Sequence, residues 1–534
     1  MSEKEYVVTL NKGVDYAQFN QEMIASTGSG DIPNRTVDVA NARHLSTRNT
    51  HYALTEAEAV ALRNDARVTD VQLRPEDRDD IEIGYDAVQT ANFDKSSSDS
   101  GDYRDWGKII HSFKENKYGT STSLGYATFD RPYSMDGTGV DIVIQDSGLQ
   151  VDHPEFKDAN GISRVQLIDW YAESGLTGSQ SSNHYRDYDG HGTHCGGTAT
   201  GLNFGWAPNA RVYSVKVGGL EGSGDSGTGI SISQCFDVIK GWHQNKPIDP
   251  NTGYKRPTIV NASWGYSGNI GTSFSNIDSY VYRGVTYNSS TEGWNSTTAY
   301  HRDTYGFYPY YRFPVYRFPS RVADVDADVQ DCIDAGIHIC IAAGNNSFKA
   351  DTSVGPGVDY DNVIFWGGGS SNYYHRGSSP FDETANMVGC TDSTPENATT
   401  ERKTSFSTTG PGVSIFAAGE NILSSCSNTN RFGAPSYFGD SNFKQTNISG
   451  TSMASPQVCG VGALYLQADP SLTPAQLKNK LEKDALAVLK DESNDANYGD
   501  TTDICGAQNR MLFNRYNRAN PFSSNIFGLR KKNR

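Results

Sequence analysis

Short runs of β-branched and aliphatic residues recur along the chain from about residue 106 onward, with helical patterns between them. Five such runs stand out: Val140–Ile144, Arg211–Val217, Thr258–Ala262, Ile337–Ala342 and Val413–Ala417. Neighbouring parallel strands need a crossover connection, which is usually a helix. The alternation therefore predicts an α/β domain built on a doubly wound, mostly parallel sheet. The chain has 534 residues, enough for one such domain and one or two small ones.

Residues 1–78 show a different pattern, that of a small α+β unit of the ferredoxin-like kind. Tyr6–Leu10 and Val68–Leu73 read as strands. Two helices are predicted between them, and the second opens with a capping box formed by Thr55 and Glu58. We therefore expect this unit to precede the α/β domain as a domain of its own.

The other boundaries come from changes in composition. Residues 79–105 are charged or polar and low in apolar side chains, which predicts a flexible linker. The α/β domain is expected at 106–520, with a surface insertion at 266–320 that is rich in Tyr, Asn, Ser and Gly. That insertion is either a surface for a partner or a packed decorative loop. Residues 521–534 form a basic tail, which we interpret as solvated.

Charge and hydropathy argue against a nucleic-acid-binding protein and against a membrane-spanning one. The net charge is −16, which argues against nucleic acid as a partner, because phosphate binding needs concentrated Lys and Arg. No stretch of the sequence approaches the roughly 20 apolar residues of a membrane span. The eight cysteines include no CxxC pair and several lie in apolar runs, so we interpret most of them as buried thiols, not as a disulfide frame.

Three segments carry residue types that suit catalysis. Asp146 ends an apolar strand, a place where α/β folds set functional groups. His191 lies in Asp-Gly-His-Gly-Thr-His, between a glycine turn and a helix of small residues. Ser452 lies in Gly-Thr-Ser-Met-Ala-Ser-Pro at the start of a predicted helix, where N–H groups favour developing negative charge. Each segment alone is a weak indication.

A metal site is the alternative interpretation of the second segment, because His191 and His194 are three residues apart. No third ligand follows at a useful spacing, and the sequence contains no HExxH motif. We therefore predict no metal at these histidines.

Taken together, the three segments fit nucleophilic catalysis. A serine hydroxyl needs a base, and the base needs a carboxylate to orient it. The segments, in the order Asp, His, Ser, resemble the signature motifs of the subtilisin-like (subtilase) serine protease family. The resemblance implies a subtilisin-like fold and a serine endopeptidase that works through an acyl-enzyme, with Asp146, His191 and Ser452 as its triad.

Two further segments match the same family. Asn345 follows a strand in Ala-Ala-Gly-Asn-Asn, and the resemblance assigns its side-chain amide to the oxyanion. Ser263, Trp264 and Gly265 follow another strand. They are similar to the family's segment whose main chain pairs with the substrate as an added strand.

The N-terminal unit is similar in layout to the inhibitory pro-domain of the family. The resemblance implies that residues 1–78 assist folding and then block the cleft, and that the enzyme can process itself. We expect the tail Arg74–Arg78 to lie along Ser263, Trp264 and Gly265, with the cut after Glu76.

No metal or organic cofactor is required for this chemistry. The segment Thr198–Pro208 is short, whereas many family members carry a longer calcium-binding loop there. The usual strong calcium site is therefore expected to be absent, and a structural calcium ion elsewhere stays open.

The expected partners are protein or peptide substrates and the chain's own pro-domain. Met1–Val8 contains no apolar export signal, so we expect a cytoplasmic protein or one associated with a particle such as a phage virion. The main rival hypothesis is an assembly protein whose protease acts only on itself. A pure binding module is disfavoured, because binding alone does not need all four catalytic residues.

Overall fold

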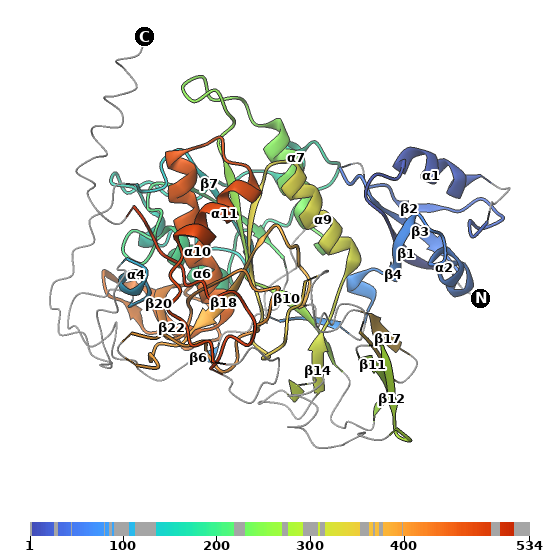
Figure 1. Cartoon of the computed structure of the whole chain (residues 1–534). Coiled ribbons are helices and arrows are strands. Elements are labelled where there is room, and N and C mark those ends of the chain that lie inside the picture. Colours follow the sequence, from blue (N-terminus) through green and yellow to red (C-terminus); the bar gives the residue numbers. More distant parts are fainter. Residues whose placement is uncertain are drawn as a thin grey trace, which may run out of the picture.

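The structure is a computed structural model, and it describes residues 3–25, 30–43, 45–78, 81–84, 88–89, 106–112, 135–217, 230–269, 276–282, 284–291, 308–309, 316–352, 362–366, 369–372, 377–397, 399–492 and 502–516. Figure 1 shows a small N-terminal unit beside a larger body that holds the central sheet. No helix among the described residues is both long and apolar enough to span a membrane.

The larger body is built on a six-stranded sheet in which all neighbouring strands are parallel. In spatial order its strands are β19 (Ile415–Ala418), β18 (Asn386–Thr391), β15 (His338–Ala342), β9 (Thr258–Ala262), β7 (Asp141–Asp146) and β8 (Arg211–Lys216). This sheet confirms the predicted α/β class. Of its six strands, β18 was not among the runs expected from the sequence.

Helices cover the sheet on both faces (Figure 1). On one side lie α6 (His191–Thr200) and α10 (Thr451–Ala468), and on the other α7 (Cys235–Asn245) and α9 (Ala323–Asp334). Every residue of α10 from Thr451 to Leu466 is buried, and most of these residues are small or apolar. The segments with His191 and Ser452, at the start of α6 and α10, are thereby held against the sheet.

Shorter elements complete this body. The helices are α4 (Trp106–Ile110), α5 (Trp170–Ser174), α11 (Pro474–Asp484), η2 (Pro154–Phe156) and η3 (Ile232–Gln234). β20 (Ile422–Cys426), β21 (Ser436–Tyr437) and β22 (Asp440–Ser449) form an antiparallel sheet.

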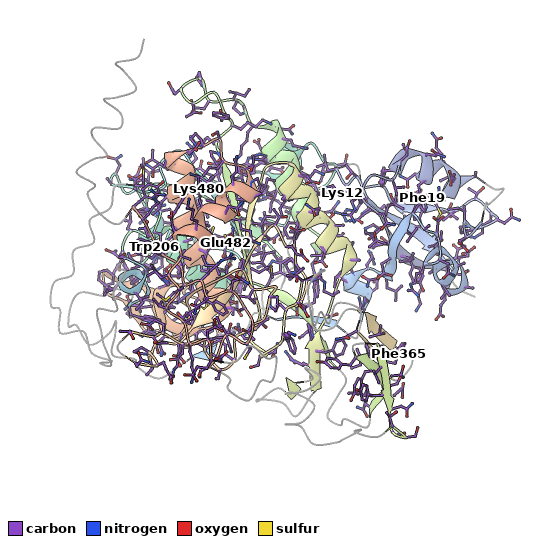
Figure 2. All side chains as sticks on the ribbon, viewed as in Figure 1. Lys12, Phe19, Trp206, Phe365, Lys480 and Glu482 are labelled. Atoms are coloured by element: carbon purple, nitrogen blue, oxygen red, sulfur yellow. The ribbon has the colours of Figure 1, made fainter. Side chains whose placement is uncertain are left out.

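The N-terminal unit is an antiparallel sheet with two helices. Its strands are β2 (Val39–Asn41), β3 (Asn49–Leu54), β1 (Lys4–Leu10) and β4 (Val68–Leu73), and its helices are α1 (Tyr16–Ile24) and α2 (Glu56–Leu62). The capping box of Thr55 and Glu58 is present. Phe19, labelled in Figure 2, is buried in a core that belongs to this unit alone.

Polar contacts fasten the N-terminal unit to α7 and α9. The fully buried guanidinium of Arg43 lies 2.8 Å from Asp237 of α7 and 2.7 Å from Asp328 of α9. Asn49 also donates to Asp328, at 3.0 Å. Lys12, labelled in Figure 2, pairs with Asp334 at the end of α9. The unit therefore meets the outer faces of two helices of the larger body.

The predicted linker 79–105 is wrong in part. β5 (Ile81–Gly84) and β6 (Val88–Gln89) lie within it and pair with strands of the larger body. Residues 79–80, 85–87 and 90–105 lie outside the described residues.

The tail of the N-terminal unit also differs from the prediction. Pro75–Asp77 forms a short 3₁₀ helix, η1, closed by a 2.7 Å ion pair between Arg74 and Asp77. The segment that lies along Gly265 is β5, not the tail Arg74–Arg78. The cut expected after Glu76 therefore loses its structural basis.

The described parts of the insertion 266–320 extend two small sheets. One has the order β13 (Tyr308–Pro309), β14 (Tyr316–Pro319), β10 (Gly265–Asn269) and β5. The other has the order β12 (Val285–Asn288), β11 (Ile277–Tyr282), β16 (Val363–Trp366) and β17 (Gly369–Asn372). An apolar cluster joins them and includes Tyr280, Phe318 and Ile364, while Phe365, labelled in Figure 2, is exposed. The basic tail 521–534 lies outside the described residues.

Candidate active site

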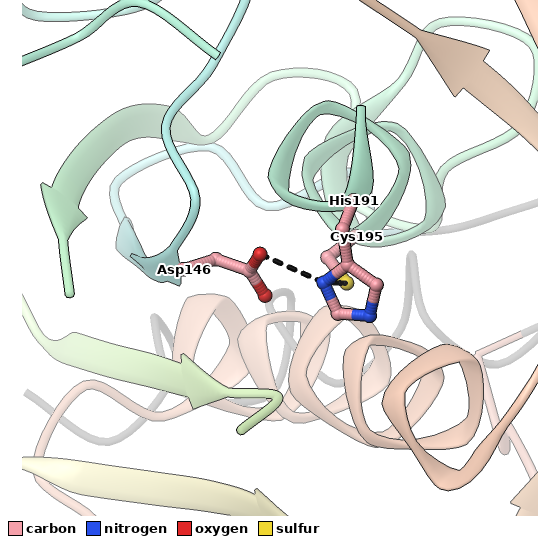
Figure 3. A group of neighbouring side chains, drawn as sticks. All are labelled: Asp146, His191 and Cys195. Carbon is pink, nitrogen blue, oxygen red and sulfur yellow. Dashed lines mark hydrogen bonds and ion pairs between the residues drawn. The ribbon is translucent and has the colours of Figure 1, made fainter. Parts of the chain in front are cut away.

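Asp146 and His191 form a buried hydrogen-bonded pair. Asp146 ends β7, and His191 begins α6. The ring Nδ1 of His191 lies 2.8 Å from Oδ1 of Asp146, and neither side chain is exposed (Figure 3). With Nδ1–H donating to the carboxylate, the basic lone pair of the neutral ring is on Nε2.

The surroundings of this pair set the pKa of His191. Burial by itself lowers that pKa, but the charge and hydrogen bond of Asp146 outweigh burial, and Asp189 adds to the effect. The pKa of His191 therefore lies above its usual value. A neutral histidine that binds protons more readily is a stronger base.

Glycines bring the two catalytic segments close together. A Cβ atom at Gly192 would lie 2.1 Å from the carbonyl oxygen of Gly148, so no larger residue fits there. Gly148 itself has φ of 113°, a left-handed conformation that favours glycine. The glycines of both motifs are thus explained by the close approach of α6 to the turn after β7.

Ser452 is the second residue of α10, and its side chain is buried in this structure. Its hydroxyl donates to the carbonyl oxygen of Ser263 at 3.2 Å. Its own carbonyl oxygen accepts from the Ser263 hydroxyl at 2.9 Å and from the Cys195 thiol at 3.3 Å. The same thiol lies 3.8 Å from Nδ1 of His191 (Figure 3). The Cys195 thiol therefore lies beside both the Asp146–His191 pair and the main chain of Ser452, while the Ser452 hydroxyl is directed to Ser263.

Asn345 is oriented by the residue that precedes the serine. Its Oδ1 accepts from the N–H of Thr451 at 2.8 Å and from the hydroxyl of Thr451 at 2.9 Å. With the oxygen so held, the NH₂ group is the end of the amide that can donate to an oxyanion. Thr451 was not expected from the sequence, although it belongs to the same motif as Ser452.

The three predicted substrate-binding residues have different roles. Gly265 begins β10 and pairs with Gly84 of β5. Trp264 is buried, and its indole N–H donates to Gln145 at 3.1 Å, so its side chain belongs to the core. Ser263 contacts the main chain of Ser452 as described above. Only the main chain of this segment is suited to pair with a substrate.

A pocket lies beside Ser452 and Asn345. Its lining includes Ser267 of β10, together with Asn346 and Ser378. Among the described lining residues no side chain is charged, and several are small or polar.

Asp187 is a further residue that sequence reasoning missed. Its carboxylate accepts from the N–H of Gly190 at 2.8 Å, from the N–H of Thr193 at 2.9 Å and from the hydroxyl of Ser147 at 2.9 Å. It therefore ties the turn after β7 to the first turn of α6. The only signal in the sequence is an acidic residue four positions before His191.

The two histidines of the motif, His191 and His194, have different partners. Within the described part of the chain, the side chains close enough to share an ion are Asp146, His191 and Cys195. Burial, with Asp146 nearby, raises the pKa of the Cys195 thiol well above its usual value, whereas a metal needs the thiolate. His194 points elsewhere, because its Nε2 lies 2.9 Å from the carbonyl oxygen of Ile422.

The short segment Thr198–Pro208 is held by protein groups. The buried carboxylate of Glu155 accepts from the N–H of Asn203 at 2.8 Å, from that of Phe204 at 3.3 Å and from the Tyr437 hydroxyl at 2.6 Å. These N–H and O–H groups supply the hydrogen bonds that a buried carboxylate requires.

All eight cysteines are free and buried. This confirms that they are thiols and not a disulfide frame. Those on which burial acts most strongly, with pKa values raised well above the usual value, are Cys195, Cys332, Cys390, Cys426 and Cys459.

Comparison with known proteins agrees with this geometry. The model of the subtilase family matches residues 137–507. The chain is 28% identical over 372 residues to the subtilisin-like serine protease Pen c 2 of Penicillium citrinum, covering 67% of this chain and 57% of that protein. It is 29% identical over 388 residues to the subtilisin-like serine protease Cur l 4.0101 of Cochliobolus lunatus, covering 70% and 55%. The chain thus spans less than two thirds of the length of these curated relatives.

A solved structure shares the fold. Fervidolysin from Fervidobacterium pennivorans, a keratinolytic enzyme related to subtilisin, superposes with a TM-score of 0.50 at 16% identity, covering 97% of this chain and 61% of that one. The match of the family model spans well over half of the chain. The chain belongs to the subtilase family.

Proposed function

We propose that this chain is a serine endopeptidase that hydrolyses peptide bonds through Asp146, His191 and Ser452. One observation carries the proposal: Asp146 and His191 form a buried 2.8 Å pair, and the Cys195 thiol lies against both His191 and the main chain of Ser452 at the start of α10. A carboxylate, an imidazole and a serine hydroxyl so arranged are the parts of a general-base nucleophile.

Each side chain has a defined role in the proposed reaction. Nε2 of His191 takes the proton of the Ser452 hydroxyl as the oxygen attacks the substrate carbonyl carbon, and Asp146 stabilises the imidazolium that forms. His191 then gives that proton to the departing amine, which leaves an ester on Ser452. Water hydrolyses the ester by the same path.

Two groups stabilise the oxyanion in this proposal. The Asn345 amide is held with its oxygen toward Thr451, so that NH₂ donates to the substrate oxygen. The first N–H groups of α10 supply a second donor, because they have no acceptor within the helix. No metal or organic cofactor takes part in this chemistry.

The proposed substrates are extended protein or peptide chains. β10 pairs with an extended segment, β5, through its main chain, and main-chain pairing of this kind recognises any peptide strand. β14 lies on the other side of β10, so β10 is supported as the interior strand of a small sheet.

The N-terminal unit is proposed to act as an inhibitor that stays bound to its own enzyme. Two observations support this role. The unit docks on α7 and α9 through the buried side chain of Arg43, and β5, which follows it, lies along β10 beside the nucleophile.

The proposal is tested by comparing Ser452→Ala with Ser471→Ala. Ser471 is an exposed serine beyond the end of α10, so its variant controls for loss of a hydroxyl. We expect Ser452→Ala to abolish hydrolysis of a denatured protein and labelling by a fluorophosphonate, with thermal unfolding unchanged. Ser471→Ala should retain both activities. Hydrolysis that survives in purified Ser452→Ala contradicts the assignment.

A further inference from the structure

A short segment, residues 378–381, connects the pocket beside Ser452 with the start of β10. Its first residue, Ser378, lines that pocket together with Ser452. It also approaches β10 closely, because a Cβ atom at Gly265 would lie 3.3 Å from the carbonyl oxygen of Ser379 and 3.7 Å from the Cβ atom of Ser378. This wall segment, residues 378–381, therefore contacts both the pocket and the strand that is proposed to pair with substrates.

Hydrogen bonds of Ser379 hold the wall segment between β10 and the start of α9. Its carbonyl oxygen accepts from the N–H of Tyr266 in β10 at 3.0 Å, and its own N–H donates to the carbonyl oxygen of Ser320 at 3.0 Å. Its hydroxyl accepts from the N–H of Val322, the residue directly before α9, at 2.8 Å. Because Ser379 is fully buried and bonded to both elements, the wall segment cannot move without breaking a hydrogen bond to one of them.

The other end of the wall segment is held by an acidic side chain of α9. Oδ1 of Asp326 accepts from the main-chain N–H of Phe381 at 2.8 Å. The guanidinium of Arg321 lies 2.5 Å from Oδ2 of Asp326, and its central carbon lies 4.3 Å from the centre of the Phe381 ring. Phe381 is thus held at its main chain by Asp326 and at its ring by Arg321.

The charge of Asp326 is part of this arrangement. Only 15% of its side chain is exposed. Burial raises the pKa of Asp326 to about 6, while Arg321 and a hydrogen bond with the Ser379 side chain act in the opposite direction. The carboxylate is therefore ionised at neutral pH, and it pairs with a guanidinium that is also largely buried. Hydrogen bonds between charged groups are stronger than those between neutral ones, so this pair fixes the end of the wall segment more firmly than the N–H of Phe381 alone.

We propose that Asp326 is a positioning residue for substrate binding, which acts with Arg321 by fixing the wall segment 378–381 against β10. This inference rests on the proposed endopeptidase activity. Asp326 lies on α9 and is not among the described residues that line the pocket. It therefore acts on a bound peptide only through the wall segment and the strand to which that segment is bonded.

The side chains proposed to carry out the chemical step are held by other contacts. Asp146 holds His191 through its 2.8 Å hydrogen bond. Thr451 holds the Asn345 amide through its N–H and its hydroxyl. None of these contacts involves Asp326 or the wall segment. Loss of the Asp326 charge should therefore weaken the binding of an extended peptide along β10 and leave the chemical step unchanged.

The test is Asp326→Asn, which keeps the size of the side chain and an oxygen for the Phe381 N–H but removes the charge. The measurements are kcat and KM for a peptide substrate, with active sites counted by fluorophosphonate labelling. We expect KM to rise roughly 10-fold, the lower end of what loss of a hydrogen bond to a charged group costs, with kcat and the labelling rate unchanged. Arg321→Met removes the other partner and should raise KM to a similar extent.

The matched control is Asp484→Asn. Asp484 also pairs with an arginine, Arg515, at 3.2 Å, and its side chain is 24% exposed. It lies at the end of α11, which packs against α10 and β15. The control therefore loses the same kind of pair at a place that does not contact the wall segment, and we expect it to keep the wild-type KM.

The outcomes separate this inference from the proposed activity. A wild-type KM in Asp326→Asn, or an equal rise of KM in Asp484→Asn, overturns the inference and leaves the endopeptidase standing. Loss of kcat and of labelling in Asp326→Asn would assign Asp326 to the triad or to the fold as a whole, and it also overturns the inference. If Asp326→Asn does not fold, Arg321→Met decides by the same criteria. A wild-type chain that neither hydrolyses the peptide nor reacts with the fluorophosphonate overturns both proposals.

Discussion

The hydroxyl of Ser263 donates a hydrogen bond of 2.9 Å to the main-chain carbonyl oxygen of Ser452. In an uninterrupted helix that oxygen would accept from the N–H four residues later. Here the later residue is Pro456, which has no N–H. Ser263 and the Cys195 thiol supply the donors that the helix lacks, and so the segment that contains Ser263 is tied directly to Ser452.

Ser263→Ala is therefore expected to lower kcat with little change in KM. Loss of one neutral hydrogen bond is worth about 1 kcal/mol, which corresponds to a roughly 3- to 10-fold loss in rate if it is expressed in the transition state. The measurement is peptide hydrolysis beside thermal unfolding. Ser414→Ala is the matched control, because Ser414 is a buried serine that donates to the carbonyl oxygen of Met387 at 3.1 Å. Equal loss of kcat in both variants would contradict a positioning role for Ser263.

Asn345→Ala is expected to lower kcat by roughly 10²- to 10³-fold, the loss known from subtilisin when one oxyanion donor is removed. Thr451→Val should reproduce part of this loss, because it removes one of the two donors that hold the Asn345 oxygen. Both variants should leave KM nearly unchanged, since the amide acts on charge that develops in the transition state. A loss below about threefold in Asn345→Ala would assign the oxyanion to other donors.

The sequence correctly predicted strands and helix starts that depend on residues close together in the chain. Val68–Leu73 and Thr258–Ala262 coincide with β4 and β9, and the capping box of Thr55 and Glu58 opens α2 where expected. A strand pattern or a cap depends on neighbours within a few residues, so one sequence is enough to find it.

The differences arise where distant segments decide the structure. β18 was missed because Asn386–Thr391 includes Asn and Gly, and only its place between two strands makes it a buried strand.

The candidate active site shows the same difference between features set by neighbouring residues and features set by distant ones. The sequence motifs identify Asp146, His191 and Ser452, because each motif is a local segment. The contact of Ser263 with Ser452 joins residues 189 positions apart, and no local pattern reports it. The register of the cleft strands was mispredicted for a similar reason, since the ion pair of Arg74 and Asp77 folds the tail into η1.

The pH dependence of kcat/KM is expected to respond to Asp189. Its carboxylate accepts from the N–H of His191 at 3.2 Å and pairs with Arg431 at 2.9 Å. Its charge raises the pKa of His191, and only neutral His191 can act as the base. Asp189→Asn should therefore lower that pKa and move the acid limb of the profile to lower pH.

The control for this prediction is Asp278→Asn, an exposed position on β11. We expect the control to superpose on the wild-type profile, measured at constant ionic strength with a neutral peptide. An acid limb that stays in place or moves to higher pH in Asp189→Asn would show that Asp189 does not act on His191 through its charge.

Arg43 is expected to decide how tightly the N-terminal unit holds its enzyme after cleavage. Its side chain is fully buried between Asp237 and Asp328, and the charge of the two carboxylates outweighs the effect of burial, which alone would lower the pKa of Arg43. Arg43→Met keeps much of the side-chain volume but leaves two buried carboxylates without this partner. Removing one member of a buried pair costs about 3–5 kcal/mol, or roughly two to four orders of magnitude in affinity.

Peptide hydrolysis by a chain cleaved between the N-terminal unit and the larger body, measured over a series of dilutions, reports this affinity. We expect Arg43→Met to become active at concentrations at which the wild-type complex stays inhibited. Arg35→Met is the matched control, because Arg35 pairs with Glu58 and Glu3 within the N-terminal unit and does not face α7 or α9. If both variants behave like the wild-type chain, the buried pair adds nothing to inhibition. In that case the pairing of β5 with β10 alone would have to hold the unit in place.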